Sequence, residues 1–301
     1  MKEYFQKVSD YLFNSLVPNE ILILNFDAEQ TDFVRFNHAK IRQAGNVNQA
    51  TLTLSLVCKR KSLNSVIRLS LDYEKDSVLL MRTLYYLRRE IPELPQDPYL
   101  MYERNINSFD RESNIKLLDS TSITDSILHD CHSLDMVGIL SSGGIMKGFS
   151  NSLGQSNWHE NQSFNFDWSM YTKSGKAIKQ NYSDQVWDQK IFNLLVEESK
   201  QKLSVIDNKE HTIKPGKYKV YLCPSALNEI VDMLSWGGFS YKANKIGSSP
   251  LHLMMKGEKK LNKAVSFIED ITNGIAPKFH SDGFIKPDIT ELIVDGEYKS
   301  S

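Results

Sequence analysis

The sequence has few of the residues that build disulfide frameworks, membrane spans or secretion signals. It contains 3 cysteines among 301 residues, too few and too scattered for a disulfide framework, and free thiols suit a reducing compartment. No apolar run approaches the roughly 20 residues that cross a bilayer. The first residues mix acidic and basic side chains and lack the apolar stretch of a signal peptide. We therefore expect a cytoplasmic protein that does not associate with membranes.

An excess of charge of either sign is also missing. The chain has 36 Lys and Arg against 37 Asp and Glu, a net charge of −1. Proteins that bind nucleic acid ordinarily carry a basic excess, so we expect no nucleic-acid partner. Hydrophobic residues make up 41% of the chain, which is near the globular average and sufficient for a buried core.

Hydrophobic periodicity predicts an α+β fold, with an N-terminal α/β domain over residues 1–205 built on an antiparallel sheet. Helical spacing covers residues 3–16, 76–90, 122–134 and 184–204. Strand patterns cover residues 20–27, 32–37, 40–47, 50–60, 65–71, 147–154, 163–172 and 177–182. A further strand, Val137–Met146, is expected to be interrupted at its glycine-serine run, residues 141–144.

Residues 206–301 predict the start of a β-rich C-terminal domain. We expect a strand over Lys217–Cys223, a helix over Pro224–Ser235, and strands over residues 265–272 and 290–295. The end of the chain reads as a strand and a turn with no return strand. Because proteins usually protect an unpaired strand edge, we expect this domain to be incomplete or its edge to be covered by a partner.

The helix Pro224–Ser235 has an amphipathic pattern and no histidine. Four of its apolar residues fall at i, i+3, i+4 and i+7, which predicts one buried stripe: Leu227, Ile230, Val231 and Leu234. Asn228 and Asp232 lie four residues apart, off that stripe.

Five short segments together resemble the TldD/PmbA family, once called modulators of DNA gyrase. They are Phe33–Gly45, the turn Asn151–Gly154, Pro215–Gly238, Lys245–Pro250 and Phe279–Gly296. In the catalytic branch of that family, the helix that follows the strand carries His-Glu-x-x-x-His. A later cysteine completes a zinc site there, and the glutamate can act as general base.

When residues are counted without gaps from the strand end Val220–Leu222, the three motif positions fall on Asp232, Met233 and Gly237. In a shifted register, Asn228 and Glu229 take the His-Glu positions and Met233 takes the position of the second histidine. Neither register supplies a histidine, and a methionine thioether is a poor zinc ligand. We also expect the chain to stop before the family's cysteine. The resemblance therefore implies the non-catalytic PmbA/TldE branch, with no metal or other cofactor of its own. Members of that branch pair with a TldD-type subunit that degrades unfolded peptides.

Three other groups of residues have a composition that could suggest a site. His129, Cys131 and His132 lie within one helical turn, but two histidines from one turn are not a metal site and helical neighbours diverge. His159-Glu160 opens like a zinc-protease motif without its second histidine, which favours a polar loop. Phe164, Phe166 and Trp168 alternate as on the buried face of a strand; the alternative is a groove in which an extended peptide adds as a strand.

The leading functional hypothesis is a PmbA/TldE-like partner or scaffold subunit of a TldD-type metallopeptidase that acts on peptides. Its role would be to shape a chamber or to present a peptide-binding edge. The alternative is a stand-alone binding or assembly protein, self-associated as a homodimer, that has no proteolytic role.

Overall fold

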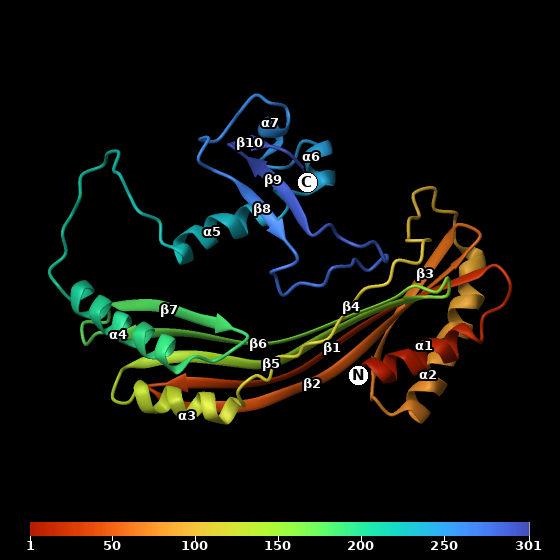
Figure 1. Cartoon of the computed structure of the whole chain (residues 1–301), viewed down its shortest axis with the longest axis horizontal. Helices are drawn as coiled ribbons and strands as arrows, with labels where there is room; N and C mark the ends of the chain where they lie inside the picture. Colours follow the sequence, from red (N-terminus) through yellow and green to blue (C-terminus); the bar gives the residue numbers. More distant parts are fainter. Residues whose placement is uncertain (301) are drawn as a thin grey trace. The chain divides into compact units, whose positions relative to one another are not determined.

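The computed structural model describes residues 1–300, and these divide into two compact units. Unit 1 comprises Met1–Glu210 together with Phe279–Ile285. Unit 2 comprises His211–Lys278 and the residues from Lys286 onward. The short segment Phe279–Ile285 thus belongs to unit 1 although it is far from the rest of that unit in sequence, a placement that no sequence pattern predicts (Figure 1).

Unit 1 is a long, mostly antiparallel sheet with four α-helices, which confirms the predicted α+β class. The sheet order is β3-β2-β1-β5-β6-β4, and β7 also pairs with β6. Only β4 runs parallel to its neighbour. The elements are α1 (Lys2–Phe13), β1 (Glu20–Asn37), β2 (Lys40–Cys58), β3 (Lys61–Leu69), α2 (Tyr73–Glu90), the 3₁₀ turn η1 (Ile91–Glu93), β4 (Asp110–Arg111), α3 (Ser120–Asp130), β5 (Met136–Asn151), β6 (Ser156–Tyr171), β7 (Ala177–Asp184) and α4 (Gln189–Ile206).

The strands of unit 1 are longer than the sequence predicted. The four strands expected between residues 20 and 60 form one hairpin of two strands, β1 with 18 residues and β2 with 19. The polar residues between the apolar runs continue the ladder instead of ending it, because their side chains lie on the wet face or at the surface. His38 and Ala39 form the turn, both with a φ of 51°, as a tight two-residue hairpin requires.

The predicted interruption of β5 at residues 141–144 was wrong. Pairing is continuous there, with Gly143 opposite Thr31 on one side and Ser163 on the other. A Cβ atom on Gly143 would lie 2.1 Å from the carbonyl oxygen of Gln30. Glycine is present because the neighbouring backbone approaches closely, so it permits the strand instead of breaking it.

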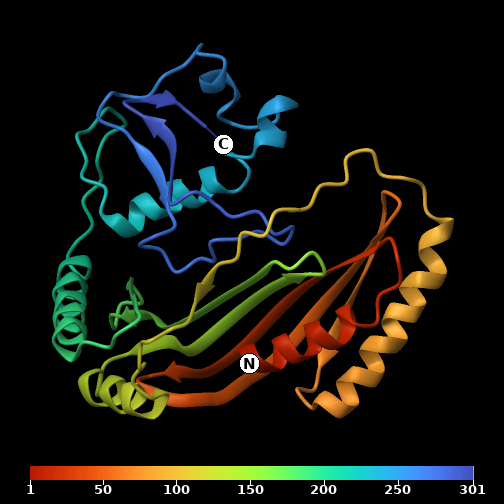
Figure 2. The same cartoon turned by 45° about the vertical axis from the view of Figure 1, so that its right-hand side comes forward.

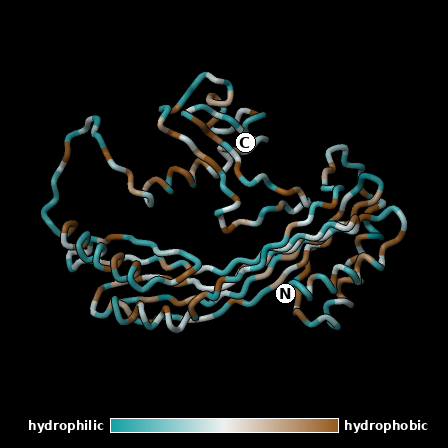
Figure 3. The backbone as a smooth tube through the Cα atoms, viewed as in Figure 1, coloured by the Kyte–Doolittle hydropathy of each residue, from teal (hydrophilic) through white to brown (hydrophobic). Residues whose placement is uncertain are grey.

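All four helices pack on one face of the sheet and build two separate hydrophobic cores (Figure 2). The first core joins α1 and α2 to β1 and β2 through residues such as Leu24 and Leu54. The second joins α3 and α4 to β5 and β6 through residues such as Leu140 and Phe166. The alternation of hydrophobic and hydrophilic residues along the long strands is visible in Figure 3. The opposite face of the sheet carries no helix of unit 1 and is largely polar.

Unit 2 contains short helices and a three-stranded sheet of order β10-β9-β8. Its elements are α5 (Pro224–Ser235), α6 (Tyr241–Lys245), α7 (His252–Met255), β8 (Phe267–Asp270), β9 (Ile289–Val294) and β10 (Glu297–Tyr298). A small core forms around Leu251, Met254 and Ile293. Across residues 1–300, no helix is both long and apolar enough to cross a membrane.

Two strand predictions in unit 2 were wrong. Lys217–Cys223 forms no strand, because none of the described strands pairs with it and its side chains are exposed. At the other end, β9 does have a return strand, β10. Asp295 and Gly296 both have positive φ, 49° and 76°, and so close a tight hairpin that was not recognised from the sequence.

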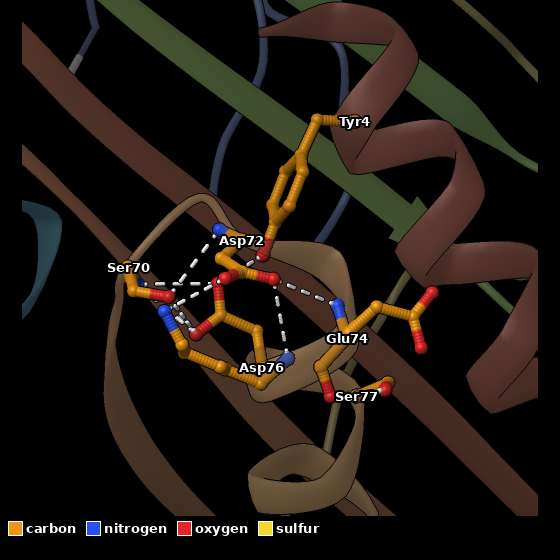
Figure 4. Close-up of polar contacts among 7 residues, drawn as sticks. Tyr4, Ser70, Asp72, Glu74, Asp76 and Ser77 are labelled. Carbon is orange, nitrogen blue, oxygen red and sulfur yellow. Dashed lines mark hydrogen bonds and ion pairs between the residues drawn. The ribbon is translucent and has the colours of Figure 1, made fainter.

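A buried carboxylate ties α1 and α2 to β3 at the first core (Figure 4). Asp76 is 3% exposed; its carboxylate accepts hydrogen bonds from the Tyr4 hydroxyl at 2.5 Å and from the Ser70 backbone N–H at 3.0 Å. Burial acts to raise the pKa of Asp76, but these hydrogen bonds outweigh it and the pKa is lowered. Asp72 caps α2 by accepting from the backbone N–H of Glu74 at 3.1 Å.

We predict that Asp76→Asn lowers the free energy of unfolding by about 2 kcal/mol at neutral pH, because the charge-assisted hydrogen bonds are lost. The folded-state pKa lies below that of an unfolded aspartate, about 3.9. The contribution is therefore fully present above that value and is lost as the pH falls through the folded-state pKa. Denaturant unfolding should show a constant difference from wild type near neutrality that narrows below about pH 4. The exposed control Asp10→Asn should change stability little; an equal loss there would contradict the assignment.

Candidate functional site

The helix α5 places the predicted motif positions at the surface. Asp232 and Met233 lie in its last turn, and Gly237 lies beyond its end with a φ of 94°. Asp232 is exposed and accepts a hydrogen bond from the Asn228 amide at 3.0 Å. Met233 is 67% exposed. These residues offer one carboxylate and no convergent imidazole or thiolate, so they do not fit a zinc ion.

The structure confirms the predicted bounds of α5, Pro224–Ser235. The apolar stripe predicted on this helix is only partly buried. Leu227 and Ile230 are 42% and 40% exposed, and only Leu234 packs against the core of unit 2. Within residues 1–300, no group of three or more His, Cys, Asp or Glu side chains is arranged to hold a metal ion.

The structure separates the side chains of the His129–His132 cluster. Cys131 is fully buried in the second core, whereas His129 and His132 are exposed. Burial raises the pKa of the Cys131 thiol to about 12. The His129 ring contacts its neighbour Asp130 at 2.8 Å. A buried thiol whose pKa is raised in this way, with both imidazoles at the surface, cannot serve as an activated nucleophile.

His159 and Glu160 lie within β6, so the polar loop expected there was wrong. His159 is 2% exposed and stands opposite Lys147 in β5 and Arg111 in β4. Neighbouring residues of a strand point to opposite faces. The pair therefore cannot form the helical arrangement of a zinc-protease motif.

The aromatic residues Phe164, Phe166 and Trp168 belong to the second core. They are 2%, 0% and 1% exposed, and the rings of Phe166 and Phe192 of α4 lie 6.0 Å apart. This part of β6 pairs with β5 on one side and with β7 on the other. It has no free edge to which a peptide could add as a strand, so the structure favours the buried-face interpretation over the groove.

Two segments that carried the family resemblance meet in unit 1. The segment Phe279–Ile285, here called the docked loop, lies against the turn that ends β5. Gln155 is 1% exposed, and its amide donates to the carbonyl oxygens of Gly283 at 2.7 Å and Asn107 at 2.9 Å. The Asn151 side chain shapes the turn by accepting from the backbone N–H of Gln155 at 3.1 Å.

Further contacts fix the docked loop along its length. The Asn25 amide donates to the Ser281 carbonyl at 3.0 Å, and the Glu103 N–H donates to the Asp282 carbonyl at 2.8 Å. Phe279 packs with Phe149 in a third hydrophobic cluster. Gly283 has a φ of 89°, and a Cβ atom on it would lie 2.5 Å from the Phe149 ring. Only glycine satisfies both the conformation and the close approach.

The polar face of the sheet carries a hollow lined in part by charged and amide side chains. An amide-rich cluster on this face centres on Asp167, which accepts from Asn165 at 2.9 Å and from Asn181 at 3.0 Å. Next to it lies this hollow of about 490 Å³, whose lining includes Arg35 and Lys179. These groups can donate and accept hydrogen bonds to a polar ligand, and no nucleophile and base are paired among them.

Comparison with known proteins gives no match to a protein-family model and none to the curated protein sequences. Solved structures do match over nearly the whole chain. A Thermotoga maritima protein that carries the provisional name modulator of a DNA gyrase superposes with a TM-score of 0.75 at 14% identity, covering 98% of this chain and 70% of that one. TldE from Thermococcus kodakarensis gives 0.66 at 12% identity, covering 100% and 69%. A Bacteroides thetaiotaomicron protein, provisionally named modulator of DNA gyrase, gives 0.64 at 13%, covering 99% and 71%.

The chain has a TldD/PmbA-type fold. Two of the segments that carry the resemblance, the turn Asn151–Gly154 and the docked loop, lie in the same unit although they are distant in sequence. Three residues that hold the docked loop in place, Gln155, Gly283 and Asn25, were not predicted from the sequence. A partial signal was the Asp282-Gly283 pair, which is typical of a tight turn.

We predict that Gly283→Ala destabilises unit 1 by about 2 kcal/mol, because alanine must adopt positive φ and displace the Phe149 ring. Gly175→Ala is the matched control, since Gly175 has a φ of 82° with no atom within 4 Å of a Cβ. Denaturant unfolding followed by tryptophan fluorescence reports mainly on unit 1, because Trp158, Trp168 and Trp187 lie there and Trp236 of unit 2 is already 95% exposed in the folded chain. Equal losses in the two variants would show that contact with Phe149 contributes nothing.

The cysteines should differ in reactivity. Hydrogen bonds from the Ser225 hydroxyl and the Ala226 backbone N–H lower the pKa of the exposed Cys223 thiol, whereas Cys131 is buried. We expect iodoacetamide to modify Cys223 at least roughly tenfold faster than Cys131 in the folded protein, by peptide mass spectrometry. Cys223→Ser should remove the fast phase. Comparable rates for both thiols would contradict the placement of Cys131 in the core.

Proposed function

We propose that this chain is a non-catalytic, TldE-like subunit that acts as partner or scaffold for a TldD-type metallopeptidase in the cytoplasm. The observation that carries the proposal is the composition of α5. The resemblance implies that catalytic members hold zinc with the corresponding helix. Counted from the sequence, those positions fall on Asp232, Met233 and Gly237, or in the shifted register on Asn228, Glu229 and Met233, and neither set supplies a histidine. The likeness to a solved TldE supports the same assignment.

In this proposal the chain contributes a surface and the partner contributes the chemistry. The polar face of the sheet has the amide and charged groups to hold an extended peptide without cleaving it. Residues at the surface of α5, including Met233 at 67% exposure, are available for contact with another protein. The substrate of the assembly would be an unfolded peptide.

A second candidate is a stand-alone binding or assembly protein that forms a homodimer without a role in proteolysis. The observation that favours it is the unpaired outer edge of β2, where residues 40–49 have no partner strand among the described residues.

We expect metal to follow the catalytic subunit. The purified chain, a candidate TldD-type subunit and their mixture would each be measured by elemental analysis and by peptidase assay on an unfolded peptide. The proposal predicts no stoichiometric metal on this chain alone, and metal in the mixture in proportion to the TldD-type subunit. The control replaces the glutamate of the partner's motif by glutamine, which should abolish cleavage while the complex persists.

Stoichiometric metal on this chain alone, removed by a chelator together with peptidase activity, would overturn the proposal. Failure to form a complex with any TldD-type subunit, combined with self-association, would favour the homodimer instead.

A further inference from the structure

Another hollow in unit 1, here called the basic hollow, lies at the turn between β2 and β3. Its volume is about 340 Å³, and three basic side chains from two segments line it: Lys59 and Arg60 of the turn, and Arg104 of the chain that follows η1. No carboxylate is among the described residues that line it. The hollow beside Arg35, by contrast, includes Asp167. The positive charge of the basic hollow is therefore not balanced within the hollow itself.

The carboxylates that lie close in sequence are engaged with other groups. Glu20 forms an ion pair with Arg88 at 2.8 Å. Glu103 accepts from the backbone N–H groups of the two residues that follow it, both at 2.8 Å. Asp97 accepts from the backbone N–H two residues further on, also at 2.8 Å. Within residues 1–300, none of the three basic side chains forms an ion pair. Their charges remain available to a ligand.

The residues of the turn are unusual for its conformation. Lys59 and Arg60 connect the paired residues Cys58 and Lys61 and have φ values of 50° and 63°. Tight hairpin turns with two positive φ values strongly favour Asn-Gly and similar pairs. Residues held in such sparsely populated conformations collect at sites that bind ligands. Asn19, which also lines the hollow, has a φ of 71°. A binding role for the two charges explains their presence at positions that local backbone preference disfavours.

The remaining walls of the basic hollow are apolar. Ile21 and Val57 face each other across β1 and β2, and Leu100 and Tyr102 complete these walls. All four belong to the third hydrophobic cluster. The guanidinium of Arg104 lies 5.2 Å from the centre of the Tyr102 ring. Apolar walls with a few converging polar groups, in a volume of this order, are typical of a site for a small organic molecule.

We propose that the basic hollow binds a small organic phosphate monoester. Lys59, Arg60 and Arg104 would hold the phosphate group, whose charge at neutral pH is about −1.5 to −2 and whose three oxygens accept strong hydrogen bonds. The planar forks of the two arginines match pairs of phosphate oxygens. The carbon portion of the ligand lies against Ile21 and Tyr102. A carboxylate offers one negative charge and two oxygens, fewer than three cations can engage. The inference does not depend on partnership with a metallopeptidase.

Isothermal titration calorimetry of the full chain with phenyl phosphate tests the proposal. The wild type should bind one equivalent with a Kd below about 1 mM at low salt. Arg104→Gln should raise the Kd at least roughly tenfold, because a charge-assisted hydrogen bond to the phosphate is lost. Arg35→Gln is the matched control: it removes the same charge from the hollow that contains Asp167, and it should leave the Kd unchanged.

A second variant separates loss of charge from loss of structure. Lys59→Asn removes a charge from the basic hollow while it supplies a residue that accepts positive φ. The variant should therefore keep the thermal midpoint of wild type and still raise the Kd for phenyl phosphate at least roughly fivefold. An unchanged Kd in both Lys59→Asn and Arg104→Gln would overturn the proposal.

Two further ligands test the chemical class. Inorganic phosphate should bind at least roughly fivefold more weakly than phenyl phosphate, because it leaves the apolar walls uncovered. Benzoate, which keeps the ring and carries a single charge, should also bind more weakly. Equal affinity for inorganic phosphate would overturn the role of the apolar walls, and equal affinity for benzoate would overturn the preference for phosphate. No binding of phenyl phosphate, or equal weakening by Arg35→Gln, would overturn the site altogether.

Discussion

The pairing of β1 with β2 on one side and with β5 on the other is the interaction on which the rest of this structure depends. The three strands run side by side over most of their length, so they give one continuous support to helices at both ends. The apolar residues of β1 divide into an early group, around Leu24, and a late group, around Phe36. Each group forms a separate core, because the polar residues Glu29–Asp32 separate the two apolar groups along the strand.

The same long pairing explains where the polar face, the unpaired strand edge and the docked loop occur. Because all four helices of unit 1 use one face, the polar residues collect on the other, including Asp167 and its amide donors. Because β2 is longer than β3, part of its edge remains bare. The docked loop adds to the end of this frame, where Gln155 and Phe149 hold Gly283. The bare edge and the polar face therefore follow from differences in strand length and from the one-sided placement of the helices.

Sequence reasoning was most successful where a local pattern determines the element. The alternation from Thr51 to Cys58 predicted a strand with one wet face, and Pro224 together with the apolar spacing predicted the bounds of α5. It failed where neighbours distant in sequence decide. Gly143 is needed because the backbone of β1 approaches closely, and its sequence neighbours do not reveal this approach. The segment Lys217–Cys223 has the residue pattern of a strand but no strand with which to pair. The bond between Gln155 and Gly283 joins residues 128 positions apart, which no local pattern predicts.

In the candidate site, too, local features could be predicted from the sequence and tertiary contacts could not. The absence of histidine at Asp232, Met233 and Gly237 was visible in the sequence, whereas the exposure of α5 and the burial of Phe164, Phe166 and Trp168 depend on tertiary contacts. The central proposal is that this chain, which has a TldD/PmbA-type fold, binds a TldD-type partner and leaves the metal to it. Native mass spectrometry of the chain co-expressed with a TldD-type subunit tests it most directly. The account predicts a complex of both subunits whose metal remains with the TldD-type subunit when they are dissociated in the gas phase. Metal retained by this chain after dissociation would contradict it.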